Sequence, residues 1–351
     1  MSDTTNSIQV PNVQSFLRGF PWVVMILVFA FLSWLFWEPF LSMFMDGESA
    51  QYASIGISTI GAYLVSIFAI AGQWPFQKVE NKWVRGILLI LLAKVIAAAF
   101  WIMLVRVFHV NIVMWAFPII SNAWLILAAT SFVGGDAHLP NVPPVRKMFL
   151  NLIIAVGGTL VLLRTIVIFP STWFAMLQPI IVTGGLAYLF RRVKQPTFSI
   201  LSWSLLLGLM WIFVSVASWL GHFTIDHNAP QFWTWNLGAG SAEFNLFFAF
   251  ACGLNFAVFA CTQCWPFSRI RQPWGTTIAL FSVLTWCFLI TRAIIPLFNT
   301  IVPGDASLWQ AQIMAWHTVF WGFSWVYCFG VGQKPYLWAG QKTPGTWDDV
   351  D

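Results

Sequence analysis

Charged side chains inside long apolar stretches are the first residues of this sequence that could carry chemistry. Counting along these stretches places three arginines and two glutamates at a similar depth, toward the outer leaflet of a membrane: Glu38, Arg106, Arg164, Glu243 and Arg292. Each such charge costs about 2.5–3.5 kcal/mol on insertion scales and needs compensation. Arginine stays charged when buried and holds planar oxyanions through paired hydrogen bonds. The set predicts ion pairs that join helices, a binding site for an anionic substrate, or side chains that reach the outer interface.

Two further ionisable residues lie inside apolar segments at other depths. Lys94 is about two turns into its expected helix, where no acidic residue of that helix is in reach. It either extends to the inner interface or takes part in substrate binding or coupling. His317 falls near the middle of its segment, where hydrogen-bonded packing competes with a proton relay or a substrate contact. No other expected helix offers a histidine at mid-depth, so the sequence argues against a stand-alone haem.

A metal site is a weaker expectation, in the longest outer loop. His222, Asp226 and His227 bring two imidazoles and a carboxylate within six residues, a combination that suits zinc, copper or iron. Ligands this close on one segment need a fourth from elsewhere, and Glu243 and His109 are the obvious candidates. An ordinary polar loop is the alternative.

Several motifs with a known mechanism are missing from the sequence. There is no P-loop, no G-x-G-x-x-G after a strand, no G-x-S-x-G elbow and no H-E-x-x-H. Nucleotide-driven transport and standard serine or zinc-dependent hydrolysis within this chain are therefore not expected. Cys261 and Cys264 have C-x-x-C spacing, but no second pair follows, so they are interpreted as small packing residues.

The composition requires elements that cross a membrane. Of the 351 residues, 59% are hydrophobic and 8% charged, whereas soluble domains carry about 25% charged residues. Together with a mean hydropathy of +0.77, this predicts an all-α, polytopic integral membrane protein. The net charge of +5 follows from the positive-inside rule, and we expect no nucleic-acid partner. The expected partners are the bilayer and either other membrane subunits or further copies of this chain.

About ten apolar segments can be drawn, and they predict ten membrane spans. They cover residues 21–44, 50–71, 86–108, 111–132, 148–169, 173–190, 198–221, 241–262, 275–297 and 308–331. With the N-terminus in the cytoplasm, every basic residue outside these segments falls on the cytoplasmic side. We therefore expect both termini in the cytoplasm and the chain in a bacterial inner membrane.

A duplicated loop indicates an internal repeat. Trp-Pro-Phe occurs at 74–76 and at 265–267, each time in a short basic loop between apolar runs. Ser-Trp-Leu at 33–35 and 218–220 recurs at a similar offset. Equivalent positions are six helices apart, an even number, which predicts a parallel repeat in a 4+2+4 arrangement. The expected divisions are a cytoplasmic tail (1–20), repeat 1 (21–132), a linking hairpin (133–194), repeat 2 (195–331) and a second cytoplasmic tail (332–351).

These patterns favour a transporter or permease-like protein for an anionic or polar small molecule. Its site would lie between the repeats beneath the outer face, where Arg106, Arg164 and Arg292 attract the substrate. Glu38 and Glu243 would balance the arginines, and Lys94 and His317 would couple transport to an ion. The alternatives are a membrane-embedded enzyme or oxidoreductase subunit acting on a lipid, quinone or metal at the outer face, and a purely structural membrane subunit.

Overall fold

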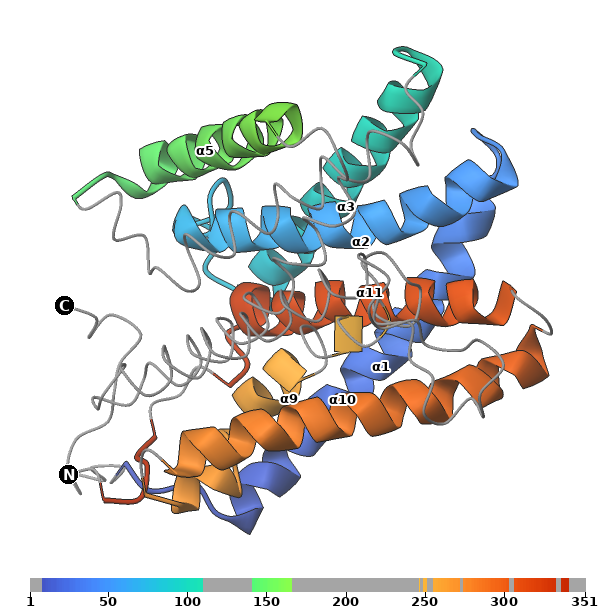
Figure 1. Cartoon of the computed structure of the whole chain (residues 1–351). Helices are drawn as coiled ribbons and strands as arrows, with labels where there is room; N and C mark the ends of the chain where they lie inside the picture. The colour runs from blue at the N-terminus through green and yellow to red at the C-terminus, as the bar shows by residue number, and fades with distance from the viewer. Residues whose placement is uncertain are drawn as a thin grey trace.

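The described part of the chain is entirely helical (Figure 1). The computed structural model describes residues 8–109, 141–165, 246, 249–250, 255–271, 274–302, 306–332 and 336–340. Within these ranges there is no strand, so the expected all-α class is confirmed. Three described helices are long and apolar enough to cross a membrane: α1 (Val13–Leu41), α2 (Gly47–Ile70) and α3 (Lys82–Arg106). The chain is therefore treated below as a membrane protein.

Helix α1 begins eight residues before its expected start. Asn12 accepts a hydrogen bond from the Ser15 backbone N–H, and the Ser15 hydroxyl accepts one from the Asn12 N–H, which makes a capping box. This cap satisfies two donors that would otherwise be free at the helix start. Helix α1 also continues through Pro21 and Pro39. Because Asn12 caps the helix before the apolar run begins, a helix start predicted from hydropathy alone comes too late.

Helices α2 and α3 also begin at side-chain caps. Asp46 accepts a hydrogen bond of 2.8 Å from the Ser49 backbone N–H at the start of α2. Asn81 accepts from the backbone N–H groups of Trp83 and Val84 at the start of α3. The asparagine cap starts α3 at Lys82, although the apolar pattern begins only at residue 86.

Helix α11 (Ala306–Phe329) is the centre of the described core. It packs against α1, α2, α3, α9 (Asn255–Thr262) and α10 (Trp274–Ile301). In Figure 1 it runs between α2 and α10, while α5 (Pro144–Thr165) lies on the far side of α2. Two of its large side chains, Trp316 and Phe320, are fully buried. Side chains presented by α11 therefore meet those of α1, α2 and α3 inside the bundle.

Two glycines on α2 allow aromatic rings to lie directly on its backbone. A Cβ added to Gly61 would lie 2.7 Å from the ring of Phe320, and one added to Gly56 would overlap the indole of Trp101. Small residues let membrane helices approach closely, which provides packing contacts where no hydrophobic effect drives association. Gly61 thus allows α11 to pack closely against α2, and Gly56 allows α3 to do the same.

The two Trp-Pro-Phe loops share a backbone conformation. The Gln73 N–H donates to the Phe68 carbonyl over 2.7 Å, and the Cys264 N–H donates to the Phe259 carbonyl over 2.9 Å. Gln73 and Cys264 both have a left-handed φ, of 64° and 55°. Both Trp–Pro peptide bonds are cis. Each first-loop residue corresponds to the second-loop residue 191 positions later, which is the offset of the Trp-Pro-Phe motif itself.

Residues 336–340 lie beside Gln9 and the second Trp-Pro-Phe loop. The Tyr336 hydroxyl donates to the Cys264 sulfur over 3.2 Å, and the Ala339 N–H donates to the Ser268 carbonyl over 2.8 Å. The Leu337 N–H reaches the Gln9 carbonyl over 3.3 Å. Residues 336–340, expected to form part of a tail, therefore pack onto the bundle. The start of α1, the second loop and the chain end lie at the same end of the helices.

Candidate functional site

A buried lysine lies at the middle of α3. Twelve residues separate Lys94 from Lys82 at the start of α3, and twelve separate it from Arg106 at the end. This position is deeper than the expected two turns because the asparagine cap starts α3 earlier. The side chain is 6% exposed, so it does not extend to either end of the helix. Its Nζ has no hydrogen-bond partner among the described residues.

Aromatic rings take the place of an ion-pair partner for Lys94. Its Nζ lies 3.7 Å from the ring centre of Phe320 on α11 and 5.4 Å from that of Trp37 on α1. A desolvated cation over an aromatic face gains about 2 kcal/mol from the quadrupole of the ring. Because this contact offers neither a hydrogen bond nor a counter-charge, the three N–H donors of the amine have no acceptor among the described residues.

His317 lies beside this lysine and is hydrogen-bonded on both ring nitrogens. It is fully buried near the middle of α11. Its Nε2 is 3.2 Å from the Ser54 hydroxyl oxygen, and its Nδ1 is 2.5 Å from that of Ser58. A neutral imidazole donates through one nitrogen and accepts through the other, so the two serine hydroxyls can serve either tautomer. The histidine is therefore held against α2 but remains able to exchange which nitrogen carries the proton.

Lys94 and His317 lie in one cluster of side chains between α2, α3 and α11. Phe320, which covers Lys94, follows His317 by three residues and so lies on the same side of α11. Two basic groups and two hydroxyls thus gather at mid-helix depth. Such a group can take up or pass on a proton, or hold an anion that enters the bundle.

A second polar cluster surrounds Glu38 near the end of α1. Gln310 Nε2 donates to the two carboxylate oxygens over 2.9 and 3.2 Å, and Gln51 Nε2 donates over 3.4 Å. The Trp34 indole N–H donates in turn to the Gln310 side-chain oxygen. These contacts tie α1 to α2 and α11. Within the described residues, amides rather than arginines are the hydrogen-bond donors to this carboxylate.

The other expected site residues are not assembled by the described structure. Arg106 is the last residue of α3 and is exposed, and Arg292 is half-buried in α10. Arg164 falls in α5. The remaining candidates lie outside the described residues: the side chain of Arg164, together with Glu243, His222, Asp226 and His227. The charged outer layer and the metal site therefore stay predictions. Within the described ranges, no group of three histidine, cysteine or acidic side chains is placed to hold a metal.

Sequence reasoning missed the neutral partners of the charged residues. Ser54 and Ser58 are four residues apart on α2, a spacing that puts both hydroxyls on one helix face. That spacing was a usable signal for a polar stripe. The role of Gln310 could not be inferred in this way, because its partner Glu38 is 272 residues away in the chain.

Comparison with known proteins does not assign the chain to a family. No protein-family model, curated protein or solved structure matches the chain.

Proposed function

We propose that the chain is a membrane transporter or permease-like protein that moves an anionic or polar small molecule, with Lys94 and His317 as its coupling residues. In this proposal the protein resides in a bacterial inner membrane with both termini in the cytoplasm. Arg106, Arg164 and Arg292 attract the substrate from the outer side, and Glu38 and Glu243 balance their charge.

The observation that carries the proposal is the buried amine of Lys94 at the centre of α3, which has no hydrogen-bond acceptor among the described residues. Ionisable residues at that depth are rare, because they cost free energy, and they mark substrate or proton pathways. A lysine kept only to hold helices together would have an acceptor, and Nζ has none among the described residues. The neighbouring imidazole provides a second proton-exchanging group at the same depth.

The proposed architecture is ten spans in a 4+2+4 arrangement with a parallel repeat. The shared backbone of the two Trp-Pro-Phe loops supports the repeat, because the corresponding hydrogen bonds and positive φ angles recur at one constant offset. Parallel repeats are common in transporters, where substrate and coupling sites lie near the midplane at the repeat interface.

Proton movement in proteoliposomes tests the coupling role. The purified chain is reconstituted with a pH-sensitive dye inside the vesicles, and small carboxylates and inorganic phosphate are added one at a time. We expect one of these anions to start proton flux in the wild type, and Lys94→Met and His317→Asn to abolish it. Lys78→Met is the matched control, because Lys78 is exposed in the first Trp-Pro-Phe loop.

The same preparation separates the competing functions. If Lys94→Met and His317→Asn fold and still support wild-type flux, these residues do not couple transport. If the variants only fail to fold, a structural role is favoured. A stoichiometric metal in the purified protein, lost in His227→Ala, would instead favour the membrane-embedded enzyme.

A further inference from the structure

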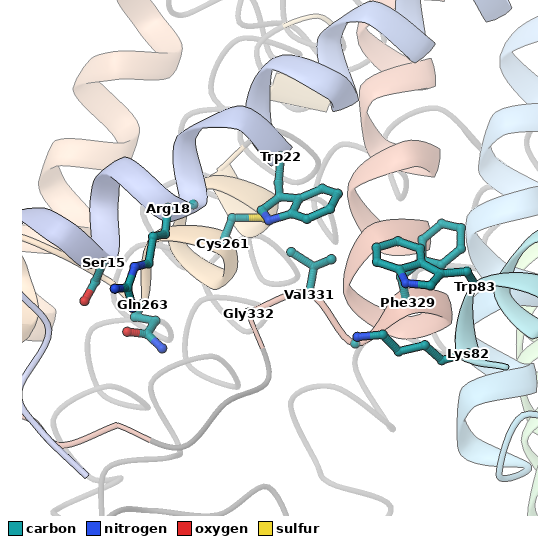
Figure 2. A pocket seen from close by; sticks show the side chains of 12 residues that line it. Ser15, Arg18, Trp22, Lys82, Trp83, Cys261, Gln263, Phe329, Val331 and Gly332 are labelled. Carbon is teal, nitrogen blue, oxygen red and sulfur yellow. The ribbon is translucent and has the colours of Figure 1, made fainter. Parts of the chain in front are cut away.

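A cleft opens at the end of the bundle where the starts of α1 and α3 lie close to the second Trp-Pro-Phe loop. Its volume is about 330 Å³, within the range of small-molecule sites. The first turns of α1 and α3, the end of α9 and the segment after α11 form its walls. Figure 2 shows Arg18 and Gln263 on one side of the cleft, Lys82 and Trp83 on the other, and Val331 between them.

Close backbone packing builds this cleft. A Cβ on Gly19 would overlap the carbonyl group of Cys261, so α1 touches the backbone at the end of α9 directly. Gly332 has a left-handed φ of 77°, and a Cβ there would overlap the carbonyl of Ala260. The segment after α11 is therefore seated tightly on the same turn of α9. The cleft is a consequence of how four segments are joined, not a gap left by one loose side chain.

The charged groups that line the cleft are all positive. Arg18 and Lys82 bring a guanidinium and an ammonium group, and Ser15 and Gln263 add uncharged donors. Among the described residues, no acidic side chain lines it. Arg18 and Lys82 are exposed side chains that line the same open cleft, and an anion bound there would be attracted by both charges. Guanidinium and ammonium groups together are the usual protein ligands of phosphate.

The residues around the cleft are of the types found at the headgroup level of a membrane. The Trp22 and Trp83 rings stack with centroids 5.7 Å apart, and tryptophan prefers the headgroup level of a membrane. Exposed apolar side chains flank the two cations along their helices. They are Leu17 and Phe20 around Arg18, and Val84 and Ile87 after Lys82. The positive charges thus lie at the helix ends, and exposed apolar side chains lie next to them. A phospholipid has the matching arrangement, with its phosphate at one end and its acyl chains beside it.

We propose that this cleft binds the headgroup phosphate of an anionic phospholipid from the adjacent leaflet. Arg18 and Lys82 hold the phosphate from opposite sides, and Gln263 and Ser15 donate to its remaining oxygens. The acyl chains lie along the exposed apolar residues of α1 and α3. Basic pockets between membrane helices recognise anionic headgroups by this combination of charge and interfacial position. The site is independent of the transport proposal, since it uses none of the mid-bundle residues.

Native mass spectrometry of the full chain in detergent, titrated with phosphatidylglycerol or phosphatidylcholine, tests the site. We expect the wild type to bind phosphatidylglycerol more tightly than phosphatidylcholine. Each of Arg18→Gln and Lys82→Gln should weaken phosphatidylglycerol binding about 5-fold, and the double variant about 30-fold, which corresponds to roughly 1 kcal/mol per cation. Phosphatidylcholine binding should be unchanged.

The double variant Lys78→Gln/Arg269→Gln is the matched control. It removes two exposed cations from the two Trp-Pro-Phe loops without touching the cleft lining, and it should leave the preference within about 2-fold, the size of context effects on exposed charges. Equal losses in the two double variants would show general surface attraction and overturn the site. A wild type without headgroup preference would do the same, whatever the variants do. Binding of inorganic phosphate that Arg18→Gln and Lys82→Gln weaken, without any preference for phosphatidylglycerol over phosphatidylcholine, would assign the cleft to free phosphate and overturn the lipid proposal.

Discussion

Replacement of Lys94 by methionine should stabilise the protein, although it removes a charged residue from the proposed coupling site. About 18 Å of helix lies on either side of Lys94, so the residue is at the depth where lysine costs about 2.5–3.5 kcal/mol. The ring of Phe320, 3.7 Å from Nζ, returns about 2 kcal/mol of this. Methionine fills a similar unbranched space without a polar group. We therefore expect Lys94→Met to raise the free energy of unfolding by about 1 kcal/mol, the difference between these terms.

Unfolding in mixed micelles with increasing sodium dodecyl sulfate measures this change. The wild type and Lys94→Met are compared by helical circular dichroism, and the shift of the midpoint gives the difference in stability. Leu91→Met is the control, because Leu91 is an exposed apolar residue on the same helix, one turn before Lys94. It should leave the midpoint near the wild-type value.

A Lys94→Met variant less stable than the wild type by 1 kcal/mol or more would refute the reasoning. Such a loss would mean that the amine has an acceptor in the native protein, so that Lys94 helps to hold the bundle together. A variant that is more stable but inactive in proton flux is the expected combination. It would show that the lysine is kept at the expense of stability.

Three further changes test the packing around the site, each measured in the same micelles. Gln310→Leu removes the main donor to the Glu38 carboxylate and should destabilise by about 2–3 kcal/mol, the usual cost of losing a hydrogen bond to a charged group; an unchanged midpoint would mean that other donors suffice. Gly56→Val drives a side chain into Trp101 and should destabilise by about 1–3 kcal/mol or more, whereas a neutral effect would contradict the close approach of α3. Asp46→Ala should cost about 1 kcal/mol at neutral pH through loss of the cap on α2. A hydrogen bond from a backbone N–H in the first turn lowers the pKa of Asp46, so its contribution is present above the ordinary pKa of 3.8 and is lost as the pH falls through the folded value; a stability difference between Asp46→Ala and the wild type that persists below that value would disprove this origin.

The helical class and the positions of the first three helices could be predicted because both depend on local sequence. Apolar runs long enough to cross a bilayer need no knowledge of their neighbours. Helix starts were less accurate, since Asn12 and Asn81 extend α1 and α3 past the apolar run by capping their first turns. This difference of a few residues places Lys94 at the middle of α3 instead of two turns from its start.

The partners of the buried charges depend on packing and could not be predicted. Glu38 lies in α1, and its strongest donor, Gln310, lies in α11. Charge matching predicts an arginine for this carboxylate, and within the described residues its hydrogen-bond donors are neutral amides. Removing one ion from water costs less than removing two unless the pair is well hydrogen-bonded. The neutral partner is therefore a reasonable solution that charge counting does not find.

The hydrogen bonds of His317 have a consequence for synthesis of the chain. Ser54 on α2 and His317 on α11 are 263 residues apart, so translation at about 5–20 residues per second separates them by roughly 13 to 53 s. During this interval α2 and α3 are in the membrane while the aromatic cover that Phe320 gives Lys94 has not yet been made. The first part of the chain thus carries a polar stripe on α2 and α3 whose partners are supplied by α11. Docking of α11 joins these groups in one register, so among the described helices α11 is the one that completes this polar cluster.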